Sequence, residues 1–122
     1  IAGFPTESEE MFARTLDLVD ECGLTMLHVF PYSARPGTAA ARMPRLPGAL
    51  VKERARRLRE KGAAALALRL DAETGRTRHV LMESATLGRS EHFMPVIASG
   101  VPGEIKTLRI AARDGEKLVE WI

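Results

Sequence analysis

Cysteine is almost absent from this chain, since Cys22 is the only one among 122 residues. A single thiol cannot form an internal disulfide, whereas a small secreted domain is expected to carry several cysteines. A single thiol also cannot ligate an iron–sulfur cluster, which takes three or four thiolates. Because Cys22 falls in the apolar stripe of an expected helix, we predict that it is a core residue.

Long apolar runs are also missing, because no stretch approaches the roughly 20 residues that cross a bilayer. The N-terminus lacks the basic-then-apolar order of a signal peptide. Together with the lone cysteine, these features predict a cytoplasmic protein with no membrane partner.

Several catalytic signatures are absent as well. The chain has no glycine loop of the Walker type, no HExxH metal spacing and no evident nucleophile with a paired base. The carboxylates of Glu7, Glu9 and Glu10 crowd one helix start, where favourable interaction with the helix dipole is a simpler role than acid/base catalysis. The residues alone therefore indicate no complete active site.

The chain has 45% hydrophobic and 28% charged residues, a composition typical of one ordinary domain or two very small ones. Ile1–Pro5 has the pattern of a buried strand that ends at a turn, and its lack of an upstream partner predicts a fragment cut inside a domain. A helix is expected from Ser8 to Cys22, capped by Thr6 or Ser8 and ended by Gly23. Leu24–Phe30 is apolar on both faces, as in a strand of a covered parallel sheet, so this part predicts a β-α-β unit.

A basic helix is expected from about Pro47 to Leu70. Residues 47–74 carry seven basic against four acidic side chains, whereas residues 1–46 carry four basic against six acidic ones. A solvated helix face explains this local basicity, and a surface that faces an RNA backbone is the alternative.

From about Gly75 the apolar period changes from 3.6 to 2. Four short strands are expected, separated by turn signals at 87–89, 100–103 and 114–115: Arg76–Glu83, His92–Ser99, Glu104–Ala112 and Lys117–Ile122. Such short strands bury their inner faces by closing into a small barrel or by packing on a neighbour.

Several motifs resemble those of the radical S-adenosylmethionine tRNA methylthiotransferases. The strongest is His28–Met43, which reads HVFPYS, RPGT and AARM as in the branch that acts on threonylcarbamoyladenosine. Gly3–Glu10 is similar to the family's GFPGETEE segment, although Thr6 replaces the usual Gly. Glu53–Arg59 is similar to its ERxxRLR segment, and Gly88–Phe93 to its GRTExF turn. Gly75–Glu83 resembles the entry to its C-terminal TRAM domain, whose later strands match only in pattern.

The resemblance implies an α/β part followed by a small all-β part. Residues 1–70 would be the last β-α-β portion of a partial, TIM-like (β/α) barrel with a basic connecting helix, and residues 71–122 an OB-like TRAM β-barrel. The family uses S-adenosylmethionine and two [4Fe-4S] clusters to transfer a methylthio group to an adenosine in the tRNA anticodon loop, here C2 of N6-threonylcarbamoyladenosine at tRNA position 37. Its CxxxCxxC motif is absent from this chain. The resemblance therefore implies that this piece has no catalytic and no metal-binding residue and is inactive without the N-terminal part of the same polypeptide.

Candidate cofactor-binding residues lie where strands end against the family's S-adenosylmethionine pocket: Gly3, Phe4, Pro5, Tyr32 and Ser33. A plain strand-to-helix turn is the alternative for the first three, and loop-anchoring hydrogen bonds are the alternative for Tyr32 and Ser33. For His28, an inward, hydrogen-bonded core position is favoured over a ligand or base. Gly37 and Thr38 are read as turn and helix-cap residues.

Candidate residues for substrate or RNA binding combine cations with aromatics, as small OB-type folds do. They are Arg35, Arg76, Arg78, Arg89, His92, Phe93 and Arg109. Arg35 can bind a carboxylate or phosphate bidentately, or pair with one of Glu7, Glu9 and Glu10. Phe93 is alternatively a core residue.

Three hypotheses follow from the sequence. The chain is a piece of a tRNA methylthiotransferase, a stand-alone RNA-binding module without catalytic activity, or a structural fragment whose exposed strand edges pair with another copy.

Overall fold

The computed structural model describes all residues from Ile1 to Ile122. They form two compact units, Ile1–Ala65 and Leu66–Ile122, each with a hydrophobic core of its own. The first unit contains helix α1 (Glu9–Glu21), a 3-10 turn η1 (Ala40–Arg42) and most of helix α2 (Gly48–Asp71). The second contains the last turns of α2 and five strands, which are β1 (Thr77–Met82), β2 (Leu87–Ser90), β3 (Pro95–Ile97), β4 (Ile105–Asp114) and β5 (Lys117–Glu120).

Helix α1 begins where the sequence predicts. The Ser8 hydroxyl accepts a hydrogen bond from the Met11 amide at 3.1 Å, and Glu9 and Glu10 lie in the first turn. The helix ends at Cys22, and Gly23 follows with φ +60°. Cys22 is exposed, so the prediction that it is a core residue was wrong.

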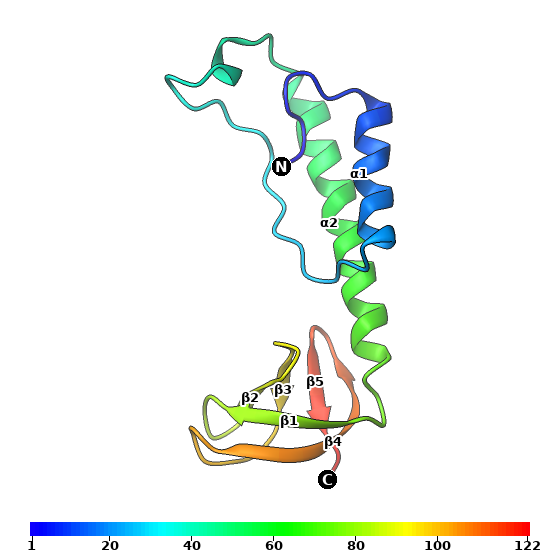
Figure 1. Ribbon diagram of the computed structural model, residues 1–122, viewed down its shortest axis with the longest axis vertical. Helices are drawn as coiled ribbons and strands as arrows, with labels where there is room; N and C mark the ends of the chain where they lie inside the picture. The colour runs from blue at the N-terminus through cyan, green and yellow to red at the C-terminus, as the bar shows by residue number, and fades with distance from the viewer. The chain divides into compact units, whose positions relative to one another are not determined.

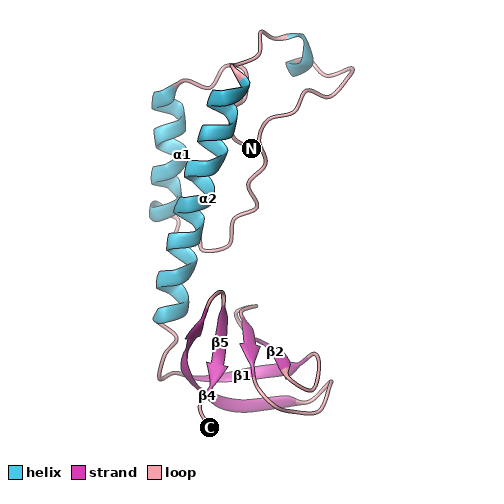
Figure 2. Ribbon diagram, turned by 180° about the vertical axis from the view of Figure 1, so that it is seen from behind, coloured by secondary structure: helices cyan, strands magenta, loops and turns pink.

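The two helices lie side by side in the first unit (Figures 1 and 2). Phe12 and Val19 of α1 pack against Ala55 and Leu58 of α2, and Ala2 joins this core from the N-terminal segment. Neither helix is long and apolar enough to cross a bilayer.

The predicted strand Leu24–Phe30 does not form, and this corrects the β-α-β prediction. The segment runs extended, and its only β-type pairing is one parallel bridge between Ala2 and Pro31. There the Ala2 amide donates to the Phe30 carbonyl at 2.9 Å, and the Tyr32 amide donates to the Ala2 carbonyl at 2.7 Å. A strand needs a hydrogen-bonded neighbour along its length, and the N-terminal segment provides one only at Ala2. Of the expected barrel portion, only the helices are evident.

The faces of this extended segment are also not both covered. Leu27 and Val29 are partly buried and pack against the first unit's core, whereas Met26, His28 and Phe30 are exposed. His28 makes no hydrogen bond, so the prediction of an inward core histidine was wrong.

The second unit is a closed barrel with the strand order β1-β2-β3-β5-β4. Every pairing is antiparallel except β3 with β5, where Val96 pairs with Leu118. The predicted closure into a small barrel is therefore confirmed, with β3 shorter than the predicted run His92–Ser99.

Strand β2 was missed, because Leu87-Gly88-Arg89 was interpreted as a turn. Gly88 instead lies within the strand, opposite Met82 of β1. A Cβ atom at this position would come within 2.5 Å of Val80 Cγ1 and 2.8 Å of the Leu81 carbonyl oxygen. The glycine is required because the two strands approach closely here, not because the chain turns.

Helix α2 supplies part of the barrel core. Leu70 is fully buried among the barrel residues Val80, Met82, Ile110 and Leu118, and Leu66 packs against the same cluster. Fully burying side chains of this size contributes about 1.5–3 kcal/mol each. The last turns of α2 are thus structurally part of the barrel unit.

Candidate cofactor groove and nucleic-acid interface

The predicted cofactor residues Gly3, Phe4 and Pro5 form a tight turn before α1. Gly3 has φ +84°, and a Cβ atom there would lie 2.7 Å from the side chain of Val51 on α2. Its amide donates to Glu7 Oε1 at 2.9 Å. Gly3 is therefore needed for a close approach between this turn and α2.

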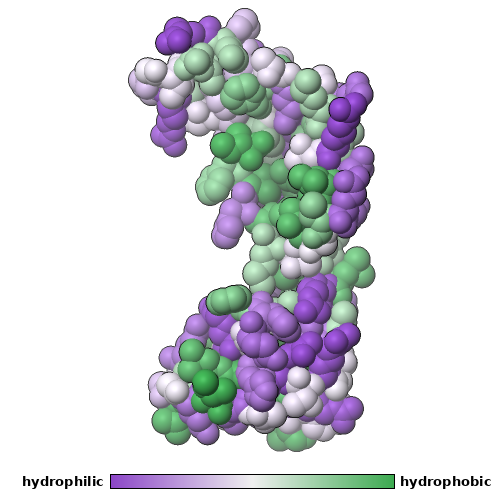
Figure 3. Space-filling view, viewed as in Figure 1, coloured by the Kyte–Doolittle hydropathy of each residue, from purple (hydrophilic) through white to green (hydrophobic).

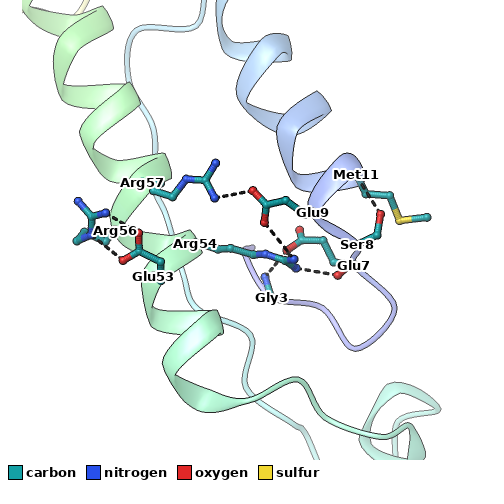
Figure 4. Close-up of polar contacts among 9 residues, drawn as sticks. All are labelled: Gly3, Glu7, Ser8, Glu9, Met11, Glu53, Arg54, Arg56 and Arg57. Carbon is teal, nitrogen blue, oxygen red and sulfur yellow. Dashed lines mark hydrogen bonds and ion pairs between the residues drawn. The ribbon is translucent and has the colours of Figure 1, made fainter.

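An ion-pair cluster anchors the turn to α2 (Figure 4). The side chain of Arg54 is almost fully buried, and its Nη1 donates to the Glu7 carbonyl at 2.7 Å and to Glu7 Oε1 at 2.9 Å. Arg57 Nη1 pairs with Glu9 Oε1 at 2.6 Å and lowers the pKa of that carboxyl. Both guanidinium groups lie over the Phe12 ring. Sequence reasoning missed this cluster. The acidic residues at the start of one expected helix and the arginines of the other could have indicated it, because the two helices pack through their apolar faces.

Most of the other cations on α2 also have partners. Arg56 pairs with Glu53 and Glu60, Lys61 with Asp20, and Arg69 with Glu73. One side of the basic helix is a solvated face, on which Lys52, Arg56 and Arg59 are exposed. On the other side, Arg54, Arg57 and Lys61 bind carboxylates of the Gly3 turn and α1 and so hold these elements together.

An apolar groove of about 680 Å³ lies beside the predicted cofactor residues. Phe4 and Tyr32 meet edge to face in its wall, with ring centroids 5.6 Å apart and planes at 77°. Ser33 and Arg35 line the same groove, whereas Gly3 and Pro5 do not. The structure thus brings together four of the six candidates from the first unit.

Two polar groups of this groove have no partner within the protein. The Tyr32 hydroxyl is buried and makes no hydrogen bond. Arg35 forms no ion pair, because the carboxylates considered as its alternative partners bind Arg54, Arg57 and Arg14 instead. The predicted turn and cap roles of the next residues are confirmed: Gly37 has φ +84°, and the Thr38 hydroxyl accepts from the Ala41 amide at 3.2 Å.

No group of three or more His, Cys, Asp or Glu side chains lies close enough to hold a metal ion. The exposed Cys22 stands alone. The residues of this chain therefore do not fit an iron–sulfur cluster.

In the barrel unit, Arg78 has a structural partner. It donates to both oxygens of Glu73, whose side chain is 1% exposed and also pairs with Arg69. The hydrogen bond from Arg78 holds the pKa of Glu73 below its ordinary value, and Glu73 in turn raises the pKa of Arg78. This triad joins the end of α2 to β1.

Arg89, His92 and Phe93 gather around the connection from β2 to β3. Arg89 pairs with Glu83 at 2.8 Å and donates to the Phe93 carbonyl at 3.2 Å. Phe93 is 71% exposed, so it is not a core residue, and with φ +62° it is the only non-glycine residue in the left-handed region. An aromatic residue held in this conformation stores strain, which is a known feature of functional positions.

Arg76 and Arg109 each bind a backbone carbonyl of the connection between α2 and β1. Arg76 Nε donates to the Ala72 carbonyl at 2.9 Å, and Arg109 Nε donates to the Gly75 carbonyl at 3.2 Å. The Arg109 guanidinium lies 5.4 Å from the centroid of the Trp121 ring. Sequence reasoning did not assign Trp121 to the site, because it placed this residue inside the expected strand Lys117–Ile122, whereas β5 ends at Glu120. On the face seen in Figure 3, the barrel is largely hydrophilic with a separate apolar patch.

Comparisons with known proteins add to this geometry. No family model matches the chain. It is 47% identical over 96 residues to threonylcarbamoyladenosine tRNA methylthiotransferase MtaB of Rickettsia prowazekii, covering 79% of this chain and 23% of that protein. It is 37% identical over 126 residues to the tRNA-2-methylthio-N(6)-dimethylallyladenosine synthase of Cereibacter sphaeroides, covering 92% of this chain and 28% of that protein. The synthase of the same name from Mycolicibacterium smegmatis is 36% identical over 139 residues, covering 98% of this chain and 26% of that protein. The chain thus spans about a quarter of the length of these curated relatives.

Proposed function

The chain belongs to the tRNA methylthiotransferase family, and from this premise we propose that it is part of a radical S-adenosylmethionine enzyme acting on N6-threonylcarbamoyladenosine at tRNA position 37. The reaction attaches a methylthio group to C2 of that base. One observation carries the choice of substrate: the motifs HVFPYS, RPGT and AARM in His28–Met43 resemble those of the threonylcarbamoyladenosine branch. Overall identity does not distinguish the two substrates, because it is 47% over 96 residues to a relative named for threonylcarbamoyladenosine and 46% over 84 residues to one named for dimethylallyladenosine.

The iron–sulfur clusters belong to the parent enzyme and not to this chain. The chain spans about a quarter of its relatives and has a single cysteine, so we assign the cluster-binding residues to the rest of the polypeptide.

The groove beside Tyr32 fits S-adenosylmethionine, which supplies the radical-forming adenosyl group and the methyl group when it is bound. Phe4 and Tyr32 offer an apolar wall for the adenine ring, and the buried Tyr32 hydroxyl is free to make a hydrogen bond. Ser33 offers a second hydroxyl. Arg35 has no ion pair and is available for a carboxylate or a phosphate at the rim. Gly3 and Pro5 contribute by shaping the turn that carries Phe4.

The barrel unit acts in this proposal as a TRAM-like RNA-binding domain. Its closed five-strand order, with β3 parallel to β5, supports an OB-like architecture. The residues that support RNA binding are Arg76, Arg109, His92 and Phe93, because Arg78 and Arg89 are engaged by Glu73 and Glu83. The expected partner is the anticodon loop of tRNA.

A segment exchange tests the proposal. This chain replaces the matching segment of the Rickettsia relative, and the tRNA nucleosides formed are measured by mass spectrometry. We expect methylthio-threonylcarbamoyladenosine. Methylthio-dimethylallyladenosine would contradict the substrate, and no methylthio product from a stably folded chimera would contradict the assignment to this enzyme. The same exchange carrying Arg35→Ala is expected to lose most of the activity while retaining the fold.

A stand-alone RNA-binding module is the second candidate, and the separate core of the barrel unit favours it. It predicts that Leu66–Ile122 binds tRNA while the exchanged enzyme stays inactive. Self-association through the extended edge at residues 24–31 is a third proposal, tested by measuring molecular mass against concentration.

A further inference from the structure

The cations of the barrel unit divide into two groups. Five have a carboxylate partner: Arg69 and Arg78 with Glu73, Arg89 with Glu83, Lys106 with Glu120 and Arg113 with Asp71. Arg76, Arg109 and Lys117 have none. The unpaired cations are the ones free to attract an external anion, because their charge is not neutralised within the protein.

Arg76 and Arg109 lie at neighbouring positions of the β1–β4 ladder, but their side chains leave opposite faces of it, because Arg76 lies opposite the buried Ile110 and Arg109 opposite the exposed Thr77. Thr77 pairs with Arg109, and the Ile110 amide donates to the Arg76 carbonyl at 2.9 Å. Each guanidinium is oriented by one backbone carbonyl, that of Ala72 for Arg76 and that of Gly75 for Arg109. A single hydrogen bond leaves the other N–H groups of each fork available to phosphate oxygens.

Trp121 adds an aromatic surface beside Arg109. Its amide donates to the Arg109 carbonyl at 2.8 Å, which fixes the residue beside β4. The side chain is largely open to solvent, since the residue is 59% exposed, and Arg109 lies over the ring. Trp121 is also one wall of a groove of about 410 Å³ that continues past Ile97 and Val119. Lys106 and Glu120 in that groove form an ion pair and cancel each other's charge. The net positive charge beside Trp121 is therefore that of Arg109.

We propose that Arg109 and Trp121 form a binding site for one unpaired nucleotide of RNA. Its base stacks on the Trp121 ring, and the neighbouring phosphate binds the Arg109 guanidinium. A cation without a carboxylate partner beside an exposed indole matches both halves of a nucleotide. The site rests on the proposed function, because it makes this face of the barrel the part that grips tRNA.

Trp121 is the only tryptophan of the chain, which gives a direct measurement. A short oligoadenylate is titrated into the 122-residue chain while intrinsic fluorescence is recorded. We expect the emission to be quenched in step with binding. In parallel, the affinity for end-labelled oligoadenylate is measured by anisotropy at several salt concentrations.

Three variants sharpen this experiment. Trp121→Leu is expected to weaken binding about tenfold by removing one stacked base. Arg109→Gln should also weaken binding and lower the salt slope by about 0.7 for a single strand. Arg113→Gln is the matched control, because Arg113 lies in the same unit but pairs with Asp71, and its affinity should stay unchanged. Circular dichroism confirms that each variant is folded.

The outcomes separate the inference from the proposed function. Binding without quenching, with Trp121→Leu equal to the parent chain, would overturn the Trp121 site and leave RNA binding by another face intact. No binding of oligoadenylate or of tRNA at low salt would overturn the RNA-binding role of the barrel and the site with it.

Discussion

At the scale of single residues, Glu73 is the most deeply buried charged side chain. It is fully buried and bonded to Arg69 and Arg78, and its pKa is lowered chiefly by the hydrogen bond from Arg78. A buried carboxylate with two guanidinium partners stabilises a fold only while it is ionised.

We therefore expect the barrel to lose stability in acid. The pKa of Glu73 is below 4.5 when folded, so its contribution is fully present above the unfolded value and is lost as pH falls through the folded one. Glu73→Gln should lower the free energy of unfolding by about 3 kcal/mol at neutral pH. Urea unfolding at neutral and acidic pH measures both effects. If the variant and the parent chain showed the same difference between the two pH values, Glu73 would not be the group responsible.

Some residue roles could be predicted from the sequence and others could not. Ser8, Gly23, Gly37 and Thr38 act locally, so their types and spacing were sufficient. The pairing of Arg54 with Glu7 joins positions 47 residues apart, and which cation faces which carboxylate depends on how the helices pack. The ion pairs of Arg78 with Glu73 and of Arg89 with Glu83 were likewise not predicted, since these residues become neighbours only in the folded barrel.

At the scale of elements, the Arg54 cluster links α1, the Gly3 turn and α2. The Arg54 side chain is 4% exposed and the Glu7 side chain 11%. Their interaction is therefore little screened by water, unlike the exposed pairs of Arg56.

Arg54→Met should destabilise the first unit by about 3 kcal/mol, because the Glu7 carboxylate would stay buried without its partner. Arg56→Met is the control on the same helix and should change stability little, since both of its partners are exposed. Hydrogen exchange of the α1 amides measures the effect. Equal protection in the two variants would contradict the role given to Arg54.

The elements also show where pattern reading fails. Both helices follow from their apolar periodicity and caps. The strand predicted at Leu24–Phe30 had the right composition but lacks hydrogen-bonded neighbours, which composition does not report. Strand β2 was missed because Gly88 resembles a turn residue until the close approach of Val80 is known.

At the scale of the whole molecule, the contribution of α2 to the barrel core determines which fragments fold. The sequence predicts that the barrel domain begins at residue 71. Leu66 and Leu70 lie before that residue, yet both pack among the barrel residues. Removing two leucines from a core of this size exposes its interior to water.

A fragment Leu66–Ile122 should therefore fold cooperatively, whereas a fragment 71–122 should not. Thermal unfolding followed by circular dichroism distinguishes the two. Within the longer fragment, Leu70→Ala should cost about 3 kcal/mol, and Leu68→Ala, at a residue that is 73% exposed, is the matched control. A cooperative transition in 71–122 would instead place the domain boundary where the sequence indicates it.

The strand order has a consequence for how the protein is made. Strand β5 is translated after the other four, but it lies between β3 and β4 and closes the barrel. While the ribosome still holds residues 117–120 in its exit tunnel, β3 and β4 have unpaired edges and the apolar interior is open. The barrel can therefore complete its fold only once residues 117–120 have left the tunnel.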